Sequence, residues 1–352
     1  MCKSTILTRI LLLASFLHLT ACSTIGYIGH TASGHLDLMQ KRQPITELVE
    51  DQSVDLKQRK KLSNALRIRE FASNTLNLPN NKSYTSYVDL QRDYVTWVVF
   101  AAPPLSLQAE TWCFFIVGCV PYRGYFDIQK AEHFAEQLKG ESLEVYIAPV
   151  PAYSTLGWFS DPLLSSMLNR GEVVTAEYIF HELAHQQVYI KNDSGFNEAF
   201  ASAVGRLGVM AWLQAEEKSD VLDRYVKRIK EKEVLYRDID HLRENLAAIY
   251  DSSLSDEEKQ TKKDLALANY KKSITEKINA WGAFDVYAPW LLKDINNAKL
   301  NALSTYQALI PKFVQLFNRC DKDFARFYKA VESLEKVAKD KRVASLARIA
   351  CS

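Results

Sequence analysis

The sequence predicts an α+β protein that is mainly helical, with a small β-sheet followed by a large helical region. Glycine and proline are sparse, at 12 and 10 of 352 residues, which leaves little material for long loops. Runs of β-branched and aromatic residues, typical of strands, are confined to residues 90–150. From residue 161 onward nearly every segment has the apolar spacing of a helix.

The predicted elements follow from these patterns in chain order. Apolar residues recur at three- and four-residue spacing from Leu36 to about Leu78, which predicts helix, and Pro79 ends it. Later, a helical hairpin is expected over residues 215–280, which lack proline and glycine, with its turn at Ser253–Asp256. The sheet with its one helix is predicted from these segments: strands at 94–100 and 143–148, strand-like runs at 112–119 and 122–126, and a helix at 128–138.

The charge of the chain excludes one large class of partners. Lysine and arginine number 44 against 42 acidic residues, and residues 1–21 hold two of the basic residues and no acid. The remainder is therefore balanced and has no basic stripe of the kind that nucleic-acid binders use. We expect no nucleic-acid partner.

The N-terminus has the features of an export signal. Lys3 and Arg9 precede an apolar run, Ile10–Leu19, that is too short to span a bilayer as a stable anchor. The run ends in Leu-Thr-Ala before Cys22, which resembles the lipobox of bacterial lipoproteins and predicts a lipid on Cys22; a plain secretory signal is the alternative. Because Ser23 rather than aspartate follows, a Gram-negative source would imply an outer-membrane lipoprotein facing the periplasm.

Four cysteines of the exported chain are expected to form disulfides. An even number of cysteines outside the cytosol favours disulfides, and no CxxC pair supports a cysteine metal site. Cys113 and Cys119 are close enough in sequence for a local hairpin bridge, which leaves Cys320 to pair with Cys351.

Residues 181–185 read His-Glu-Leu-Ala-His and carry the chemistry of the chain. On a helix, His181 and His185 project from one face a turn apart, as metal ligands do. Glu182 lies beside the metal position, where it can take a proton from a metal-bound water. Residues 175–189 contain no proline or glycine, so a helix is expected there. Two histidine ligands, completed by one carboxylate ligand from another part of the chain, favour a single Zn²⁺ ion.

The third metal ligand is expected from the next helix. Glu198 follows His185 by thirteen residues. A turn at 191–195 between them lets the chain return antiparallel to the first helix. Small residues in the second helix allow it to pack closely against the first. Asn197 could orient Glu198 or a substrate. Two alternatives stay open: surface histidines without metal, and a metal site without catalysis.

Several ordered motifs together resemble the bacterial "putative aminopeptidase" lipoprotein family. They are the lipobox, the cysteine segment continuing to Phe126, residues 153–158 before an Asp-Pro pair, the HELAHQ and Phe-Asn-Glu motifs, and Asn-Asn-Ala at 296–298 followed by Tyr306. The resemblance implies a zincin-like fold of the gluzincin type and zinc aminopeptidase activity. The chain lacks the Gly-x-Met-Glu-Asn string with which gluzincin aminopeptidases hold a free amine, so an endopeptidase of envelope peptides remains an alternative.

Further roles are assigned within this resemblance. Tyr306 is the candidate for stabilising the oxyanion, although it could equally be a packed helix residue. Ser154, Thr155 and Gly157 are candidates for the wall along which a peptide substrate lies, or for a structural turn, and Asn197 joins them as a substrate-contact candidate. A non-catalytic metal-binding lipoprotein acting in envelope assembly is the alternative from another functional class.

The chain is accordingly divided into four predicted segments, and its predicted partners are a peptide substrate and a membrane reached through the lipid. The segments are a lipoprotein signal peptide (1–21), an N-terminal helical segment (22–90), a zincin-like catalytic region (91–210) and a C-terminal helical region (211–352).

Overall fold

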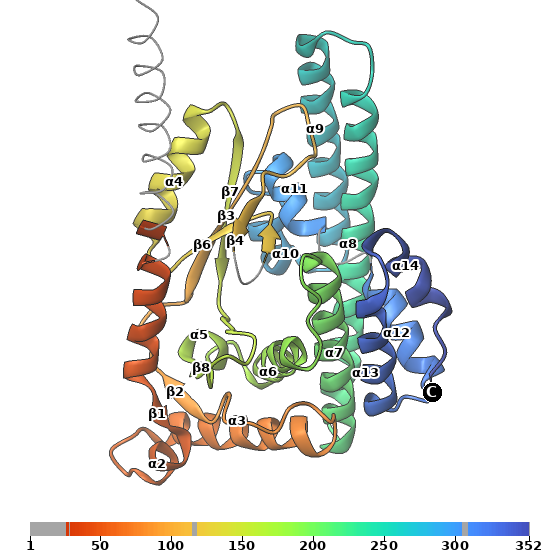
Figure 1. The fold of residues 1–352 in the computed structure, drawn as a ribbon. Coiled ribbons are helices and arrows are strands. Elements are labelled where there is room, and N and C mark those ends of the chain that lie inside the picture. The colour runs from red at the N-terminus through yellow and green to blue at the C-terminus, as the bar shows by residue number, and fades with distance from the viewer. Residues whose placement is uncertain (1–25, 28, 115–117, 305–308, 352) are drawn as a thin grey trace, which may run out of the picture.

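The computed structural model describes residues 26–351 apart from 28, 115–117 and 305–308, and it is mainly helical with small sheets (Figure 1). The predicted α+β class is therefore confirmed. None of the helices in this part of the chain combines the length and apolar character needed to cross a bilayer.

The N-terminal stretch is mostly helical, as expected, but it is interrupted, and its last helix ends at Asn74, before Pro79. Residues 29–41 are helical, and the chain then forms β1 (Gln43–Pro44), α2 (Ile45–Glu50) and α3 (Leu56–Asn74). Two aspartates cause the break: Asp51 accepts a hydrogen bond from the Ser53 amide, and Asp55 caps α3 through the amides of its first turn. Short polar side chains compete with helix continuation in this way.

A three-stranded antiparallel sheet, in the order β6-β3-β7, forms where strands were expected. Its strands are β3 (Thr96–Ala102), β6 (Arg123–Tyr125) and β7 (Glu144–Val150), and α4 (Ile128–Gly140) joins the last two. Successive residues of β3 face opposite sides: Val99 and Ala101 pack against α4, while Phe100 and Ala102 pack toward α11 (Asn297–Ser304). The sheet is therefore covered by one helix on each face (Figure 1).

Both expected disulfides are present in the structure. Cys113 and Cys119 join β4 (Trp112–Phe114) to β5 (Gly118–Val120) in a hairpin. Cys320 and Cys351 connect the end of α12 (Ile310–Arg319) to the C-terminal tail.

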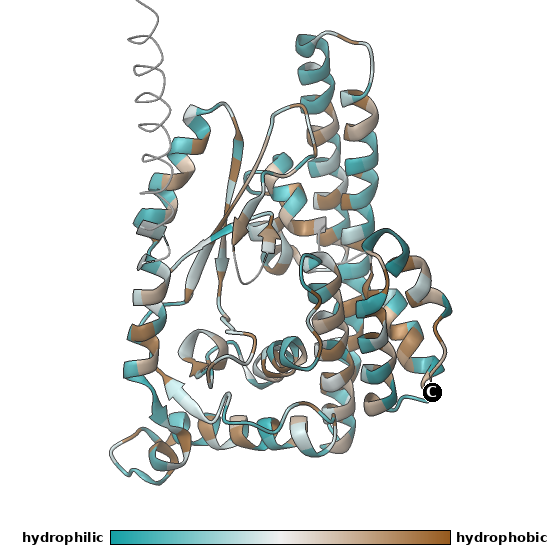
Figure 2. Ribbon diagram, viewed as in Figure 1, coloured by the Kyte–Doolittle hydropathy of each residue, from teal (hydrophilic) through white to brown (hydrophobic). Residues whose placement is uncertain are grey.

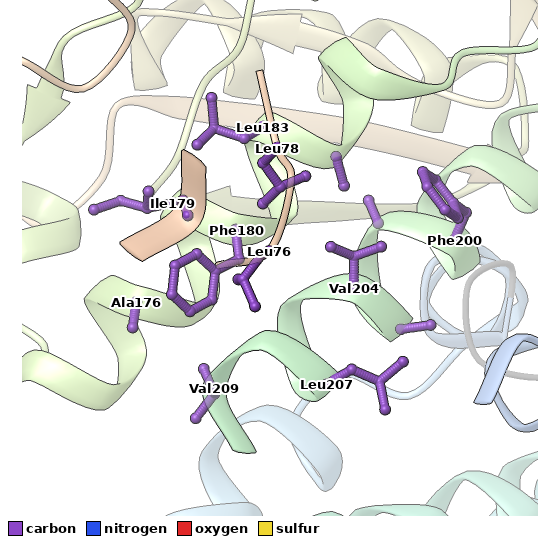
Figure 3. Packing of buried hydrophobic residues seen from close by; sticks show 14 of the residues in the cluster. Leu76, Leu78, Ala176, Ile179, Phe180, Leu183, Phe200, Val204, Leu207 and Val209 are labelled. Atoms are coloured by element: carbon purple, nitrogen blue, oxygen red, sulfur yellow. The ribbon is translucent and has the colours of Figure 1, made fainter. Parts of the chain in front are cut away.

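The largest hydrophobic core surrounds two helices, α6 (Glu172–Gln187) and α7 (Ser194–Ala215). Figure 3 shows apolar residues of both helices, with Leu76 and Leu78 from the segment after α3, pointing into this core. Ahead of α6, β2 (Ser86–Val88) pairs with β8 (Leu163–Leu164), and the short helix α5 (Ser165–Leu168) follows.

A long helical hairpin follows α7, with its turn at the predicted place. It comprises α8 (Ser219–Tyr250) and α9 (Asp256–Ala280), and Ser255 and Glu258 form a reciprocal capping box at the start of α9. Its apolar residues form a second core with α10 (Phe284–Leu291). In Figure 2 the end of the hairpin near the turn is largely hydrophilic. The chain ends with α13 (Phe324–Glu332), a 3-10 turn (Ser333–Lys336) and α14 (Lys339–Arg348).

Candidate metal site on the α6–α7 helix pair

Helix α6 is held rigidly because one side of it lies in the largest core. Ile179, Phe180, Leu183 and Ala184 are each fully buried there. An adjacent side of α6 carries His181 and His185, whose rings lie 4.8 Å apart between centroids. The helical period therefore separates the packing residues from the candidate metal ligands.

Glycines on α7 permit a close approach to α6. A Cβ atom at Gly205 would lie 3.1 Å from the Glu177 carbonyl oxygen and 3.5 Å from the Cβ of His181. One turn further, a Cβ at Gly208 would lie 2.7 Å from the ring of Phe180. A larger residue at either position would push the two helices apart and move the face that carries the histidines.

Asn197 fixes the turn between the two helices. Its Oδ1 accepts a hydrogen bond of 2.8 Å from the Ile190 amide, and its Nδ2 donates one of 2.7 Å to the Ile190 carbonyl. The side chain is only 2% exposed. Its contact with substrate stays a prediction, and its observed hydrogen bonds hold the turn just before Glu198. Helix α7 begins at Ser194, after Asp193.

The structure brings His181, His185 and Glu198 together. The two Nε2 atoms are 3.2 Å apart, and they lie 3.4 and 3.5 Å from the carboxylate oxygens of Glu198. Ligands placed on a tetrahedron with metal–ligand bonds near 2.05 Å are separated by about 3.3 Å. The two Nε2 atoms thus have the spacing of two corners of a zinc tetrahedron, and a different oxygen of Glu198 lies at a similar distance from each of them.

The electrostatics of Glu198 suit a ligand that remains ionised. Burial opposes its charge, but the charges and hydrogen bonds of His185 and His181 outweigh burial and hold the pKa of Glu198 well below its ordinary value. Within the described chain, the buried Nδ1 of His185 has no hydrogen-bond partner. The other ring nitrogen of His185, Nε2, lies toward His181 and Glu198.

Glu182 lies next to this cluster in a buried position. It is 9% exposed, and burial raises its pKa to about 7, with His181 opposing and the carboxylates of Glu198 and Asp161 adding to the rise. A carboxyl group with a pKa near neutrality can both accept and return a proton at physiological pH.

The segment containing Ser154, Thr155 and Gly157 is fixed by a buried carboxylate. Asp161 is fully buried, and it accepts hydrogen bonds from both hydroxyls and from the Thr155 amide, at 3.3, 2.8 and 2.9 Å. Gly157 has a φ of 84° and lies over the side chain of Gln186 on α6. The segment therefore borders the helix of the metal cluster, while its contact with substrate stays a prediction.

Two tyrosines near the cluster were missed by the sequence analysis. Tyr122 has a pKa raised by burial and, next, by the charge of Glu198, and Tyr189 shows the same two causes. Tyr122 packs its ring on Phe100 of the sheet, 5.6 Å away between centroids. Its place in the cysteine-containing motif was the one signal in the sequence that could have found it.

Two predicted residues fall outside the described part of the chain. Tyr306 belongs to residues 305–308, and Cys22 belongs to residues 1–25. Their proposed roles in oxyanion stabilisation and lipidation stay predictions.

The comparisons with known proteins give one match. Residues 26–346 match the model of a family described as "Putative aminopeptidase". No curated protein and no solved structure matches the chain.

Proposed function

Because this chain belongs to the family described as "Putative aminopeptidase", we propose that it is a zinc-dependent aminopeptidase built on the α6–α7 helix pair. The observation that carries the proposal is that the Nε2 atoms of His181 and His185 lie 3.2 Å apart, and that each lies 3.4 or 3.5 Å from one of the two carboxylate oxygens of Glu198. This spacing fits one zinc ion with its fourth position open, as catalytic zinc sites require.

The residues around this position divide the chemistry among them. A zinc ion, when bound, would polarise the scissile carbonyl and lower the pKa of a water molecule. Glu182 takes the proton from that water and passes it to the leaving amine, a role supported by its pKa of about 7. Tyr306, and Tyr122 as a second candidate, would donate a hydrogen bond to the oxyanion.

Peptide cleavage tests the activity. The purified chain, loaded with zinc, is incubated with a pool of free and N-acetylated peptides, and the products are identified by mass spectrometry. We expect single-residue losses from free N-termini and none from acetylated ones. Glu182→Gln should abolish them while zinc stays bound. Internal cuts in both pools would identify an endopeptidase. The absence of the Gly-x-Met-Glu-Asn string, which holds the free amine in gluzincin aminopeptidases, is the observation that favours this alternative. Zinc binding without any cleavage would identify a non-catalytic binding protein.

Metal content tests the ligands separately from the activity. We expect one zinc ion per chain and a large loss of affinity in His181→Ala and Glu198→Gln, because each removes one of three donors. His133→Ala is the matched control, since His133 is exposed on α4 and contacts Gln137 instead. Equal zinc content in all four proteins would exclude the cluster as the metal site.

A lipid on Cys22 would place this peptidase in the cell envelope and, in a Gram-negative source, at the outer membrane facing the periplasm. The signal-like residues 1–21 and the cysteine after them support this proposal. Labelling cells with a radioactive fatty acid should mark the wild-type chain and leave Cys22→Ser unlabelled. Release of the variant into the soluble periplasmic fraction is the second expected result, and label on the variant would contradict the proposal.

A further inference from the structure

The first described residues of the chain are docked on the edge of the β6-β3-β7 sheet. The hydroxyl of Tyr27 accepts a hydrogen bond of 3.2 Å from the Gly124 amide. Similarly, His30 Nε2 accepts one of 3.2 Å from the Phe126 amide. The guanidinium of Arg123 lies over the ring of Tyr27, 4.1 Å from its centroid. Because these contacts satisfy amides at the sheet edge that would otherwise be unpaired, the chain is fixed to the body of the protein from Tyr27 onward.

The distance between this docked position and the proposed lipid is short. Four residues, 23–26, separate Cys22 from Tyr27. An extended chain spans at most about 3.5 Å per residue, so the Cα atoms of Cys22 and Tyr27 can be no more than about 18 Å apart. A lipid on Cys22 would therefore hold the body of the protein directly against the bilayer, and the surface that faces the bilayer would lie close to the N-terminal helix.

The N-terminal helix, residues 29–41, has an inner and an outer side. It runs along the outside of the molecule, from the start of α4 to β1 (Figure 1). Its inner side packs on the body of the protein, since Leu38 is buried and a Cβ atom at Gly34 would overlap the ring of Phe126. The helical period places Leu36 on the opposite side, and this residue is 56% exposed. The outer side thus presents a large apolar side chain.

Two exposed aromatic side chains lie beside this helix, at the end of the turn that contains Gly157. Trp158 is 71% exposed and Phe159 is 55% exposed. The ring of Phe159 lies 4.7 Å from the ring of His35 between centroids. One residue further, the Ser160 carbonyl accepts a hydrogen bond of 3.5 Å from the Arg42 guanidinium. The aromatic pair is therefore next to the helix that begins near the proposed lipid.

Hydrogen bonds hold the turn that carries these aromatic residues. The Trp158 amide donates to the Thr155 carbonyl at 3.1 Å, and the Phe159 amide donates to Thr155 Oγ1 at 3.1 Å. Thr155 is itself held by the buried Asp161 carboxylate. Leu156 has a φ of 56°, which is unfavourable for a bulky residue and is retained mostly in functional segments. The fold therefore presents Trp158 and Phe159 to the outside in a fixed position.

The charges around this region suit the headgroup layer of a bilayer. Arg42 at the end of the N-terminal helix and Lys130 beside its start are both exposed, and basic side chains attract anionic lipids. Asp37, the one acidic residue of the helix, is paired with Lys41 at 2.7 Å. Burial lowers the pKa of His35, so the ring next to Phe159 carries no charge at neutral pH. Tryptophan rings themselves favour the headgroup level of a bilayer.

We propose that Leu36, Trp158 and Phe159 form a face that lies on the surface of a phospholipid bilayer and fixes the orientation of the protein on the membrane. This inference rests on the lipid proposed at Cys22 and is independent of the peptidase activity. The lipid brings the face to the bilayer at a high effective concentration, so three apolar side chains are sufficient to hold it there. Isolated apolar residues on a surface need no explanation, but these three lie together beside the end of the chain that the lipid would anchor.

Fluorescence quenching in vesicles tests the proposal. The protein, purified from membranes, is reconstituted into vesicles of phosphatidylethanolamine and phosphatidylglycerol, with or without bromine on the acyl chains, and flotation in a density gradient verifies binding. The emission of the wild type minus that of Trp158→Phe gives the signal of Trp158. This signal should fall by at least about twofold in the brominated vesicles. Trp281→Phe is the matched control, since Trp281 is half-buried at the end of α9, and its signal should be equal in both kinds of vesicle.

A second pair of variants tests the face without changing its fluorophore. Leu36→Asp should reduce the quenching of Trp158 by about twofold, because a carboxylate is repelled from the apolar part of the bilayer. Leu265→Asp is the control, since Leu265 is also an exposed leucine, 61% exposed, but lies on α9, and it should leave the quenching unchanged. Circular dichroism should show the same fold in all variants.

The remaining outcomes separate the face from the lipid anchor and from other occupants. Flotation with the vesicles, but without quenching of Trp158, would overturn the face and leave the lipid on Cys22 in place. Failure to float would overturn both proposals. A Trp158 signal that is equal in both kinds of vesicle, but changes when a peptide is added in detergent, would overturn the face and identify a peptide as its occupant.

Discussion

Replacing Asn197 by alanine should destabilise the protein and weaken its metal site together. The amide of Asn197 satisfies both the N–H and the C=O of Ile190, at 2.8 and 2.7 Å, in a place where the side chain is 2% exposed. Alanine leaves the buried Ile190 amide without a partner, and the Ile190 carbonyl keeps only the 3.3 Å hydrogen bond from the Asp193 amide. An unpartnered buried amide costs about 1–3 kcal/mol, so we expect the free energy of unfolding to fall by about 2 kcal/mol. That is a large part of the ~5–15 kcal/mol of a typical protein.

Urea denaturation followed by circular dichroism measures this loss. Asn245→Ala is the matched control, because Asn245 is exposed on α8 and its truncation should change the free energy of unfolding by less than about 0.5 kcal/mol. Zinc affinity should decline in Asn197→Ala alone, since Glu198 follows Asn197 directly and depends on the same turn.

The outcome also separates two roles for Asn197. A substrate-binding side chain would raise the KM of Asn197→Ala while leaving its unfolding curve and zinc content unchanged. A side chain that only stabilises the turn would instead lower the unfolding midpoint and the zinc affinity when it is replaced. A variant that unfolds at the same urea concentration as the wild type would refute the reasoning from the two hydrogen bonds.

Three more predictions follow from the described contacts. Tyr122→Phe should lower peptide turnover by about tenfold at unchanged zinc content, because the half-buried tyrosine lies within the field of the Glu198 carboxylate; equal turnover would exclude it from the reaction. Gly208→Ala should lower the free energy of unfolding by about 1 kcal/mol, since crowding against Phe180 outweighs the gain in helix propensity, whereas Gly140→Ala, in open space, should raise it in the same urea titration. Burial lowers the pKa of Lys299 to about 8, so between pH 8 and 10.5 the unfolded chain binds more protons and stability rises with pH. Lys299→Met should lose this rise, and equal rises in both proteins would contradict the assignment.

Local patterns were sufficient to predict much of the architecture. The absence of proline and glycine from residues 215–280 predicted the helical hairpin, and the Ser-Asp-Glu-Glu start placed its turn where Ser255 caps α9. The spacing of His181, Glu182 and His185 placed two donors on one helical face, and a short turn brought Glu198 back to them. Each of these inferences depends on residues close together in sequence, so a periodic pattern can carry it.

Features that depend on distant contacts could not be predicted in this way. Tyr122 lies near Glu198 because the chain folds the segment before β6 toward α7, and no spacing in the sequence relates the two residues. Asp161 holds Thr155 by a hydrogen bond in a fully buried position, and a single sequence does not display which carboxylates are buried. The break at Asp51–Asp55 was missed because the apolar spacing on either side is helical.

The turn between α6 and α7 shows how distant segments control the candidate metal site. The hairpin β4–β5 reaches it through the Cys119 amide, which donates to Asn192 Oδ1 at 3.3 Å. From the opposite end of the chain, Lys339 donates to the Asn192 carbonyl at 3.0 Å, and Arg342 forms a buried ion pair with Asp193. Since this turn sets where α7 begins, and hence the position of Glu198 relative to the two histidines, the disulfide hairpin and the C-terminal helix both act on the geometry of the cluster. The candidate ligands lie close together in sequence, but their relative positions depend on contacts made by the β4–β5 hairpin and by α14.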